Sequence, residues 1–358
     1  MGRRAILGLF SLALTALLIE VGARLILALI GPGNAPIEFG WKPSGGRAST
    51  FRDRVYVPDS RVFFRLSPNL DIEITSNPRI FDLHTDSRGM RSPEPAIPKP
   101  SGNYRVLAIG DSCTFGSGAG QSGTYPMQLE RHLLGMRNKP RFEVLNAGVP
   151  GFTSFQSLGL FEMEGAALSP DAVIFASGYN DASPATAGSK RPFGSERMMS
   201  DRAYAESLRR SQSLGFTRLL WRAGFSIGST EERIGDSTPA KHRVSVREYG
   251  ANLRSFVDLS RARGATPVLV VWPRRSQISS PSRHEERDRL MDRYHEEMRR
   301  VGRTANAAVL DLKETLQGRE DLFVDIIHLN AHGYGLVAEA LAKIVLADVD
   351  RRATSRRQ

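Results

Sequence analysis

From residue 104 onward, short and continuously apolar runs alternate with stretches of helical periodicity. The apolar runs lie at residues 106–110, 142–148, 171–178, 266–273 and 307–312. The helical stretches lie at residues 124–136, 153–168, 245–264, 283–303 and 333–346. Strands that are apolar along their whole length are typical of parallel sheets covered on both faces. The alternation therefore predicts a parallel sheet between two layers of helices, with ligands bound at the carboxyl ends of the strands.

The composition of the 358 residues is that of a folded globular chain, with 41% hydrophobic and 24% charged residues. The single cysteine, Cys113, excludes an internal disulfide and a zinc site built on paired thiolates. The net charge of +11 includes +2 from residues 1–30 and +4 from the arginines of the tail, which leaves a mild excess for the remainder. Because no zinc-finger, RNP or helix-turn-helix pattern accompanies this charge, we expect no nucleic-acid partner.

Residues 5–30 form the most apolar stretch of the chain, after a basic start and before a Gly-Pro pair. They reach the length of about 20 residues that spans a bilayer only with Glu20 and Arg24 included, which stand four apart and can pair. No convincing cleavage site precedes the Gly-Pro pair, so residues 1–32 are predicted to be an uncleaved signal anchor, a single transmembrane helix. The basic start places the remainder outside the cytoplasm, which is the periplasm if the source is a bacterium. A cleaved secretory signal and a buried or peripheral amphipathic helix are the alternatives.

The rest of the chain divides into segments that differ in composition and in the pattern of apolar residues. Prolines and short extended runs predict a linker and a small β-rich lead-in over residues 33–100. The alternating domain is predicted over residues 101–348, and residues 349–358 form a basic tail. Residues 183–243 interrupt the alternation with polar and basic sequence around one predicted helix at 207–222, which indicates an insertion near the carboxyl edge of the sheet.

Residues that can carry chemistry follow the first three apolar runs. Ser112 lies in GDSCTFG between a strand and a helix, where it can act as a nucleophile or cap the helix. Gly148 ends the second strand, where glycine allows close approach of the backbone to a ligand or a tight turn. Asn180 in GYND follows the third strand, as a donor to the crevice or as a turn residue. Cys113 is an alternative nucleophile, although a buried thiol packs well as an apolar residue.

Asp325 and His328 stand three residues apart in DIIH, just before the last helix. At this spacing the carboxylate can orient the imidazole, which then serves as a base in the crevice. His332, at the start of the helix, competes for this role but has no carboxylate three residues before it. All of these motifs fall in order at loops on one predicted edge of the sheet, which favours a single shared site.

The four motifs together resemble the SGNH or GDSL hydrolase family. That family has a Ser in GDS, a Gly after the second strand, an Asn in GxND and a D-x-x-H near the carboxyl end. The resemblance covers residues 104–346, and its only small departure is Cys113 at the variable fourth position of GDSL. It implies a flavodoxin-like three-layer α/β/α fold. Residues 85–94, TDSRGMRSPE, look like the segment before the GDS loop in membrane-anchored bacterial members.

The resemblance also implies roles for the site residues. Ser112 would be the nucleophile and His328 the base, oriented by Asp325. The oxyanion hole would be made by the N–H groups of Ser112 and Gly148 and by the side-chain amide of Asn180. No metal or organic cofactor is implied.

The implied reaction is hydrolysis of carboxylic esters, including acetyl esters, through an acyl intermediate on Ser112. Small-molecule esters or acylated glycans are the expected substrates. One alternative is an O-acyltransferase that acts on cell-envelope or extracellular carbohydrate, with a sugar hydroxyl in place of water. The other is a non-catalytic carbohydrate-binding protein, against which the intact set of site residues argues. The residues predict neither the acyl specificity nor an oligomeric state.

Overall fold

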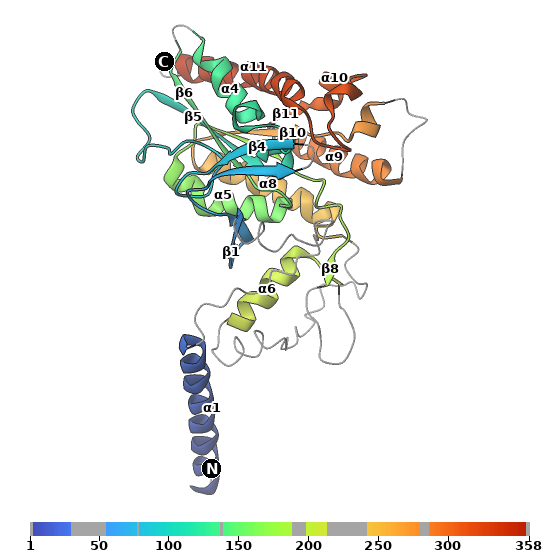
Figure 1. The fold of residues 1–358 in the computed structure, drawn as a ribbon. Coiled ribbons are helices and arrows are strands. Elements are labelled where there is room, and N and C mark those ends of the chain that lie inside the picture. The colour runs from blue at the N-terminus through green and yellow to red at the C-terminus, as the bar shows by residue number, and fades with distance from the viewer. Residues whose placement is uncertain are drawn as a thin grey trace.

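The structure, a computed structural model, describes residues 3–29, 55–76, 79–136, 139–187, 198–212, 242–279 and 286–355 (Figure 1). Its centre is a sheet of β5 (Asn103–Gly110), β6 (Arg141–Gly148), β7 (Ala172–Ala176), β10 (Thr266–Val271) and β11 (Ala308–Asp311). Neighbouring strands pair in parallel, in the order β6–β5–β7–β10–β11. This is the order of flavodoxin-like folds, and it confirms the predicted parallel sheet. The order reverses direction beside β5, where such folds open a crevice at the carboxyl ends.

Helices cover both faces of this sheet (Figure 1). One face packs against α5 (Ser154–Leu168), α8 (Val246–Ala262) and α9 (Glu286–Thr304), the other against α4 (Tyr125–Leu134) and α11 (Ala331–Ser355). The side chains of β5 alternate between the two hydrophobic clusters. Leu107 and Ile109 join the first cluster, and Val106 and Ala108 join the second. Burial on both faces explains the continuous apolar runs and confirms the three-layer expectation.

Local capping explains where several helices begin and end. Thr153 begins α5 and forms a capping box with Gln156. Ser245 begins α8 and forms a capping box with Glu248, the residue pair that the sequence SVRE at 245–248 offers for it. Gly264 follows α8 with a φ of 73°, a left-handed conformation that glycine adopts without strain.

The last helix continues further than its sequence predicts. α11 runs to Ser355, through most of the predicted basic tail, whereas its apolar periodicity ends near residue 346. Arg352 explains the extension, because its Nε donates to Asp348 at 2.6 Å. One Nη of the same side chain donates to the backbone carbonyls of Asp171 and Gly264. The positive charge also lies near the carboxyl end of the helix, where the helix dipole favours it.

The segment before β5 packs onto the domain. β1 (Tyr56–Asp59) pairs with β2 (Phe63–Leu66), and β3 (Asp71–Ser76) pairs with β4 (Arg79–His84), in two antiparallel hairpins. The short extended runs of the sequence, at residues 54–57, 61–66 and 70–74, correspond to β1, β2 and β3, and none of them corresponds to β4. Val62, Leu66 and Leu83 are fully buried in the same cluster as Leu107. The described part of residues 33–100, predicted as a linker and a small β-rich lead-in, therefore shares the core of the domain, because its apolar side chains pack with those of the sheet.

The predicted insertion of residues 183–243 is described in part. β8 (Thr186–Ala187) pairs with β9 (Met198–Met199), and α6 (Asp201–Gln212) follows. Most of the helix predicted at 207–222 lies outside the described residues. The shorter elements are α3 (Ser112–Phe115), α10 (Leu312–Leu316) and the 3-10 turns η1 (Gln121–Gly123), η2 (Arg275–Ile278) and η4 (Glu320–Leu322).

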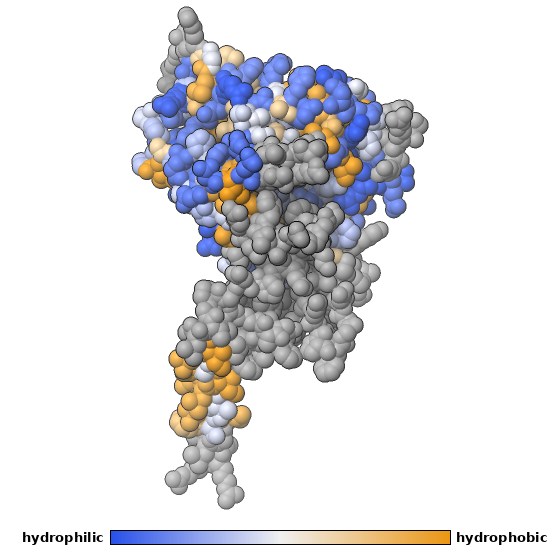
Figure 2. Space-filling view, in the orientation of Figure 1, coloured by the Kyte–Doolittle hydropathy of each residue, from blue (hydrophilic) through white to orange (hydrophobic). Residues whose placement is uncertain are grey.

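At the amino terminus lies α1 (Arg3–Leu29), on whose surface apolar side chains gather (Figure 2). Phe10 and Leu12 are each about two-thirds exposed, at 67% and 70%. Glu20 and Arg24 pair across one turn, with Oε1 and Nε 2.7 Å apart, as their spacing predicts. Among the residues that the structure describes, no helix is long and apolar enough to cross a membrane.

Candidate active site

Ser112 is the first residue of α3, and one residue separates it from the end of β5. Asp111 occupies the N-cap position, and its Oδ1 accepts the N–H of Cys113 at 2.9 Å. The capping role that the sequence left open for Ser112 therefore falls to Asp111. The hydroxyl of Ser112 remains available to a partner outside the helix. Gly116, with a φ of 90°, ends α3 after a single turn.

That partner is a histidine far away in the sequence. Oγ of Ser112 lies 2.7 Å from Nε2 of His328. Nδ1 of the same ring lies 2.7 Å from Oδ2 of Asp325, whose Oδ1 accepts the backbone N–H of His328 at 2.8 Å. The structure thus brings the three residues into one chain of hydrogen bonds. Within the described part of the chain, no group of three or more His, Cys, Asp or Glu side chains is arranged to hold a metal ion.

The charge of Asp325 sets the orientation of the imidazole. Burial alone would raise the pKa of this carboxyl, but the hydrogen bond and charge of His328 and two backbone N–H groups outweigh burial and lower it to about 2. The carboxylate is therefore charged at neutral pH and accepts the Nδ1 proton, which leaves Nε2 to accept from Ser112. Trp272 supports the loop, because its indole N–H donates to the carbonyl of Ile327 at 3.0 Å. The competing His332 is exposed at the start of α11.

The remaining predicted site residues lie at the ends of neighbouring strands. Gly148 ends β6, and its N–H donates to Oδ1 of Asn146 at 3.0 Å. Asn180 lies in the loop after β7, and its Nδ2 donates one N–H to the carbonyl of Phe152 at 2.9 Å. The structure therefore places both residues on the same edge of the sheet as Ser112. The sequence did not predict that the Gly148 N–H bonds to a neighbouring side chain.

Two glycines allow α3 to lie directly against the strand ends. A Cβ on Gly148 would lie 2.1 Å from the backbone N of Phe115, and a Cβ on Gly110 would lie 2.1 Å from the carbonyl oxygen of Ala176. Real side chains do not approach so closely, so any other residue at position 148 would displace α3. A residue at position 110 would displace the end of β7 and would also lie 2.4 Å from Oγ1 of Thr114 in α3. Gly148 has no positive φ, so its role is close approach rather than a turn.

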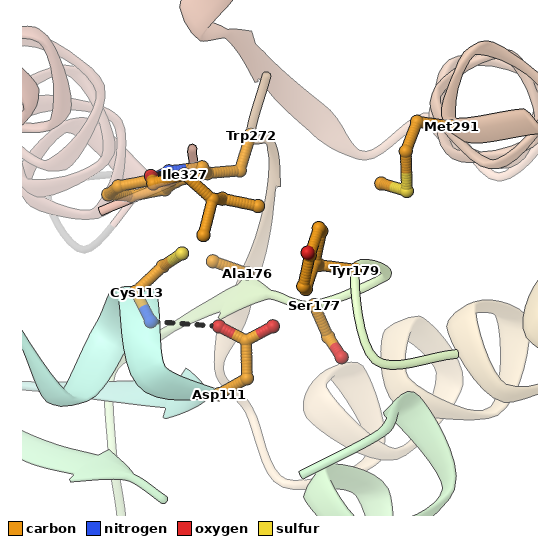
Figure 3. A pocket seen from close by; sticks show the side chains of 8 residues that line it. All are labelled: Asp111, Cys113, Ala176, Ser177, Tyr179, Trp272, Met291 and Ile327. Carbon is orange, nitrogen blue, oxygen red and sulfur yellow. Dashed lines mark hydrogen bonds between the residues drawn. The ribbon is translucent and has the colours of Figure 1, made fainter. Parts of the chain in front are cut away.

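Cys113 is buried, and its sulfur points into a small cavity (Figure 3). Burial, reinforced by the charge of Asp111, raises the pKa of this thiol well above its ordinary value. A protonated thiol is a poor nucleophile, which favours the packing role for Cys113. The cavity measures about 10 Å³ and is lined by Asp111, Cys113, Ala176, Ser177, Tyr179, Trp272, Met291 and Ile327.

Sequence reasoning missed two buried residues that connect these loops. Asn146 links α3 to the end of β6, because its Nδ2 donates to the carbonyl of Phe115 while its Oδ1 accepts from Gly148. Asp181, whose pKa burial raises to about 7, accepts the N–H of Ser154 at 3.0 Å. A polar residue within an otherwise apolar strand end was the available signal for Asn146. Asp181 lay in the quoted GYND motif without a role.

The chain is similar to one family of known proteins and to several solved structures. The GDSL-like Lipase/Acylhydrolase family matches residues 108–336 of the chain. Similar solved structures include an acetylxylan esterase from Geobacillus stearothermophilus, at 20% identity and a TM-score of 0.45, covering 68% of this chain and 94% of that chain. A lipase/acylhydrolase from Enterococcus faecalis is similar at 19% identity and a TM-score of 0.44, covering 68% of this chain and 95% of that chain.

No curated protein matches the chain. The family match alone extends over more than half of the sequence and includes every predicted site residue from Ser112 to His328. The protein thus belongs to the GDSL-like lipase/acylhydrolase family and is a hydrolase that acts on ester bonds.

Proposed function

We propose that the protein is a serine esterase in which Ser112 is the nucleophile, His328 the general base and Asp325 the residue that orients the base. The chain of two 2.7 Å hydrogen bonds through the His328 ring carries this proposal. A serine hydroxyl is a weak nucleophile and needs an adjacent base, and the base needs a partner that sets its tautomer. This arrangement meets both needs.

In the proposed reaction, Nε2 of His328 takes the hydroxyl proton as Oγ of Ser112 attacks the ester carbonyl. The tetrahedral intermediate collapses when the bond to the alcohol oxygen breaks and His328 returns its proton to that oxygen. An acyl group is then bound to Ser112. Water, deprotonated by His328, attacks this acyl group, and the proton passes back to Ser112 as the acid leaves. Asp325 stabilises the imidazolium that forms in both steps.

The oxyanion would form beside three N–H donors. The N–H of Ser112 has no acceptor within α3, because the first residues of a helix lack such partners. The amide of Asn180 has a second N–H besides the one given to Phe152. The N–H of Gly148 would have to share the oxyanion with Asn146. Donors fixed in this way stabilise developing charge without reorganising during the reaction.

The acyl group of the substrate is proposed to be short, with acetyl as the expected case. The cavity is next to the site, because its lining includes the residues on either side of Ser112 and the residue before His328. Its volume of about 10 Å³ is the space of about one water molecule. A longer acyl chain would have to displace the side chains of Trp272 and Ile327, and the indole N–H of Trp272 is hydrogen-bonded to the carbonyl of Ile327.

We further propose that residues 5–30 anchor the enzyme in a membrane, with the catalytic domain outside the cytoplasm. The sequence supports this, because the apolar stretch of residues 5–30 is longer than the part of α1 whose side chains the structure describes. The exposed apolar side chains of α1, Phe10 among them, also favour burial in lipid over contact with water.

The size limit predicts a steep dependence on acyl length. The kcat/KM for p-nitrophenyl acetate should exceed that for the octanoyl ester by about tenfold or more, because each displaced packing contact costs on the order of 1 kcal/mol. Steady-state kinetics on esters of increasing length measure the trend. Equal values for the acetyl and octanoyl esters would contradict the short acyl site.

The nucleophile assignment predicts unequal effects at two adjacent residues. Ser112→Ala should lower kcat by several orders of magnitude, because no other group can form the acyl intermediate. Cys113→Ala should retain most of the activity and lose only packing free energy. Both variants are compared for hydrolysis of p-nitrophenyl acetate and for thermal unfolding. An inactive, folded Cys113→Ala beside an active Ser112→Ala would assign the nucleophile to the thiol.

The charge of Asp325 predicts the effect of removing it. Because the pKa of Asp325 is lowered to about 2, this carboxylate stays charged above pH 4. Asp325→Asn, which removes that charge, should therefore lower kcat by up to about 10⁴-fold throughout the range above pH 4. Steady-state kinetics with p-nitrophenyl acetate at several pH values measure the loss. A kcat in folded Asp325→Asn equal to that of the wild-type protein would contradict the orienting role of Asp325.

The proposed anchor predicts that the full-length protein and a protein that starts at residue 33 differ in membrane association when they are expressed in bacteria. The full chain should stay with membranes washed in alkaline carbonate, whereas a chain that starts at residue 33 should be recovered folded in the soluble fraction. Immunoblots of the fractions measure this distribution. Full-length protein in the soluble fraction would refute the anchor, and a mature terminus near residue 30 would show a cleaved signal.

A further inference from the structure

Arg91 is an unexpected buried cation beside the nucleophile. It lies in the lead-in before β5, and none of its surface is exposed. Its backbone N–H donates to the carbonyl of Asn146 at 2.9 Å, and the hydroxyl of the next residue, Ser92, accepts the N–H of Asn146 at 2.5 Å. These two bonds place the lead-in alongside the end of β6.

The guanidinium of Arg91 reaches the turn that follows Ser112. Nη1 donates to the carbonyls of Phe115 and Gly116 at 2.9 and 3.3 Å, and Nη2 donates to that of Ala119 at 3.1 Å. Nε donates to the side chain of Gln121 at 3.0 Å. The guanidinium carbon also lies 4.5 Å from the centre of the Phe115 ring. One side chain thus contacts the end of α3 and, at Ala119 and Gln121, the segment that leads to α4.

A short helix needs such a contact. α3 has four residues, and a helix of this length does not persist through its own hydrogen bonds. The last carbonyls of a helix lack partners within it and carry partial negative charge, which a cation at that end stabilises. Burial lowers the pKa of Arg91 to about 10, so the side chain is still charged at neutral pH. Arg91 therefore supplies donors to the end of α3, beside the one from Nδ2 of Asn146, and it also supplies the charge that this end favours.

We propose that Arg91 is a positioning residue for Ser112, which fixes α3 from its carboxyl end so that the serine at its amino end meets His328. The inference rests on the proposed role of Ser112 as nucleophile. Arg91 acts through backbone carbonyls, and its three acceptors in this turn lie C-terminal to Ser112. It should therefore change how fast bound ester reacts rather than how tightly the ester binds.

The test compares Arg91→Lys with Arg105→Lys in the full-length protein. Arg105 is a matched control, since it is also fully buried and donates to backbone carbonyls, but it lies near the opposite end of β5. Both substitutions should lower the thermal midpoint. Below both midpoints, Arg91→Lys should lower kcat for p-nitrophenyl acetate by about 10²-fold with little change in KM, because a misplacement of about 1 Å costs that much. Arg105→Lys should keep kcat within about twofold.

A lysine keeps the charge but loses the planar set of donors. Methylguanidinium added to Arg91→Ala should therefore restore part of the lost kcat, and methylammonium should not. If Arg91→Lys and Arg91→Ala do not fold, Gln121→Ala, which removes the acceptor of Nε, should still lower kcat several-fold. Wild-type kcat in a folded Arg91→Lys, or in Gln121→Ala when the arginine variants do not fold, would overturn the inference. An equal loss in Arg105→Lys would do the same.

The outcomes separate this inference from the proposed function. If Ser112→Ala is inactive while Arg91→Lys has wild-type kcat, the nucleophile assignment stands and the positioning role fails. If Ser112→Ala remains active, the nucleophile assignment fails, whatever the arginine variants show.

Discussion

The site depends on the close packing of α3 against the ends of β5 and β6. Gly148 makes this packing possible, because a Cβ there would lie 2.1 Å from the backbone N of Phe115 in α3. Gly110 contributes as well, because a Cβ there would lie 2.4 Å from Oγ1 of Thr114. Backbone packed on backbone leaves little room for adjustment, so Ser112 occupies one place relative to the sheet. The arrangement also buries polar ends of a very short helix, which must be satisfied from outside it. Asp111 does so at the amino end, and Arg91 does so at the carboxyl end.

The other site loops are connected by polar contacts of the same kind. Asp181 joins the loop of Asn180 to the start of α5, and Trp272 joins the end of β10 to the loop of His328. Each contact is buried or nearly so, where a hydrogen bond is costly to leave unmade. Residues from distant parts of the chain are thereby fixed at one edge before any ester arrives. Such preorganisation is how hydrogen-bond donors and bases lower a reaction barrier.

The sequence predicted the features that follow from hydrophobic periodicity and from the order of the motifs along the chain. The apolar runs predicted the five strands of the sheet. The order of the motifs predicted that Ser112, Asp325 and His328 lie at one edge of it. The contacts of Arg91 and Asn146 were not predictable in this way, because a side chain that bonds to distant backbone carbonyls leaves no periodic trace. β4 was missed for a similar reason. Val62 and Leu83 are isolated apolar residues whose burial depends on packing with the sheet.

The central claim is that ester hydrolysis proceeds through an acyl group on Ser112. The most direct test mixes the enzyme with p-nitrophenyl acetate, quenches the reaction with acid within the first turnover, and locates the acetyl group by peptide mass spectrometry. The account predicts an initial burst of nitrophenol and acetyl on the peptide that contains GDSCTFG, with fragment ions that assign it to Ser112. Acetyl found on Cys113, or rapid turnover with no acetyl bound to the protein at any time, would contradict the account.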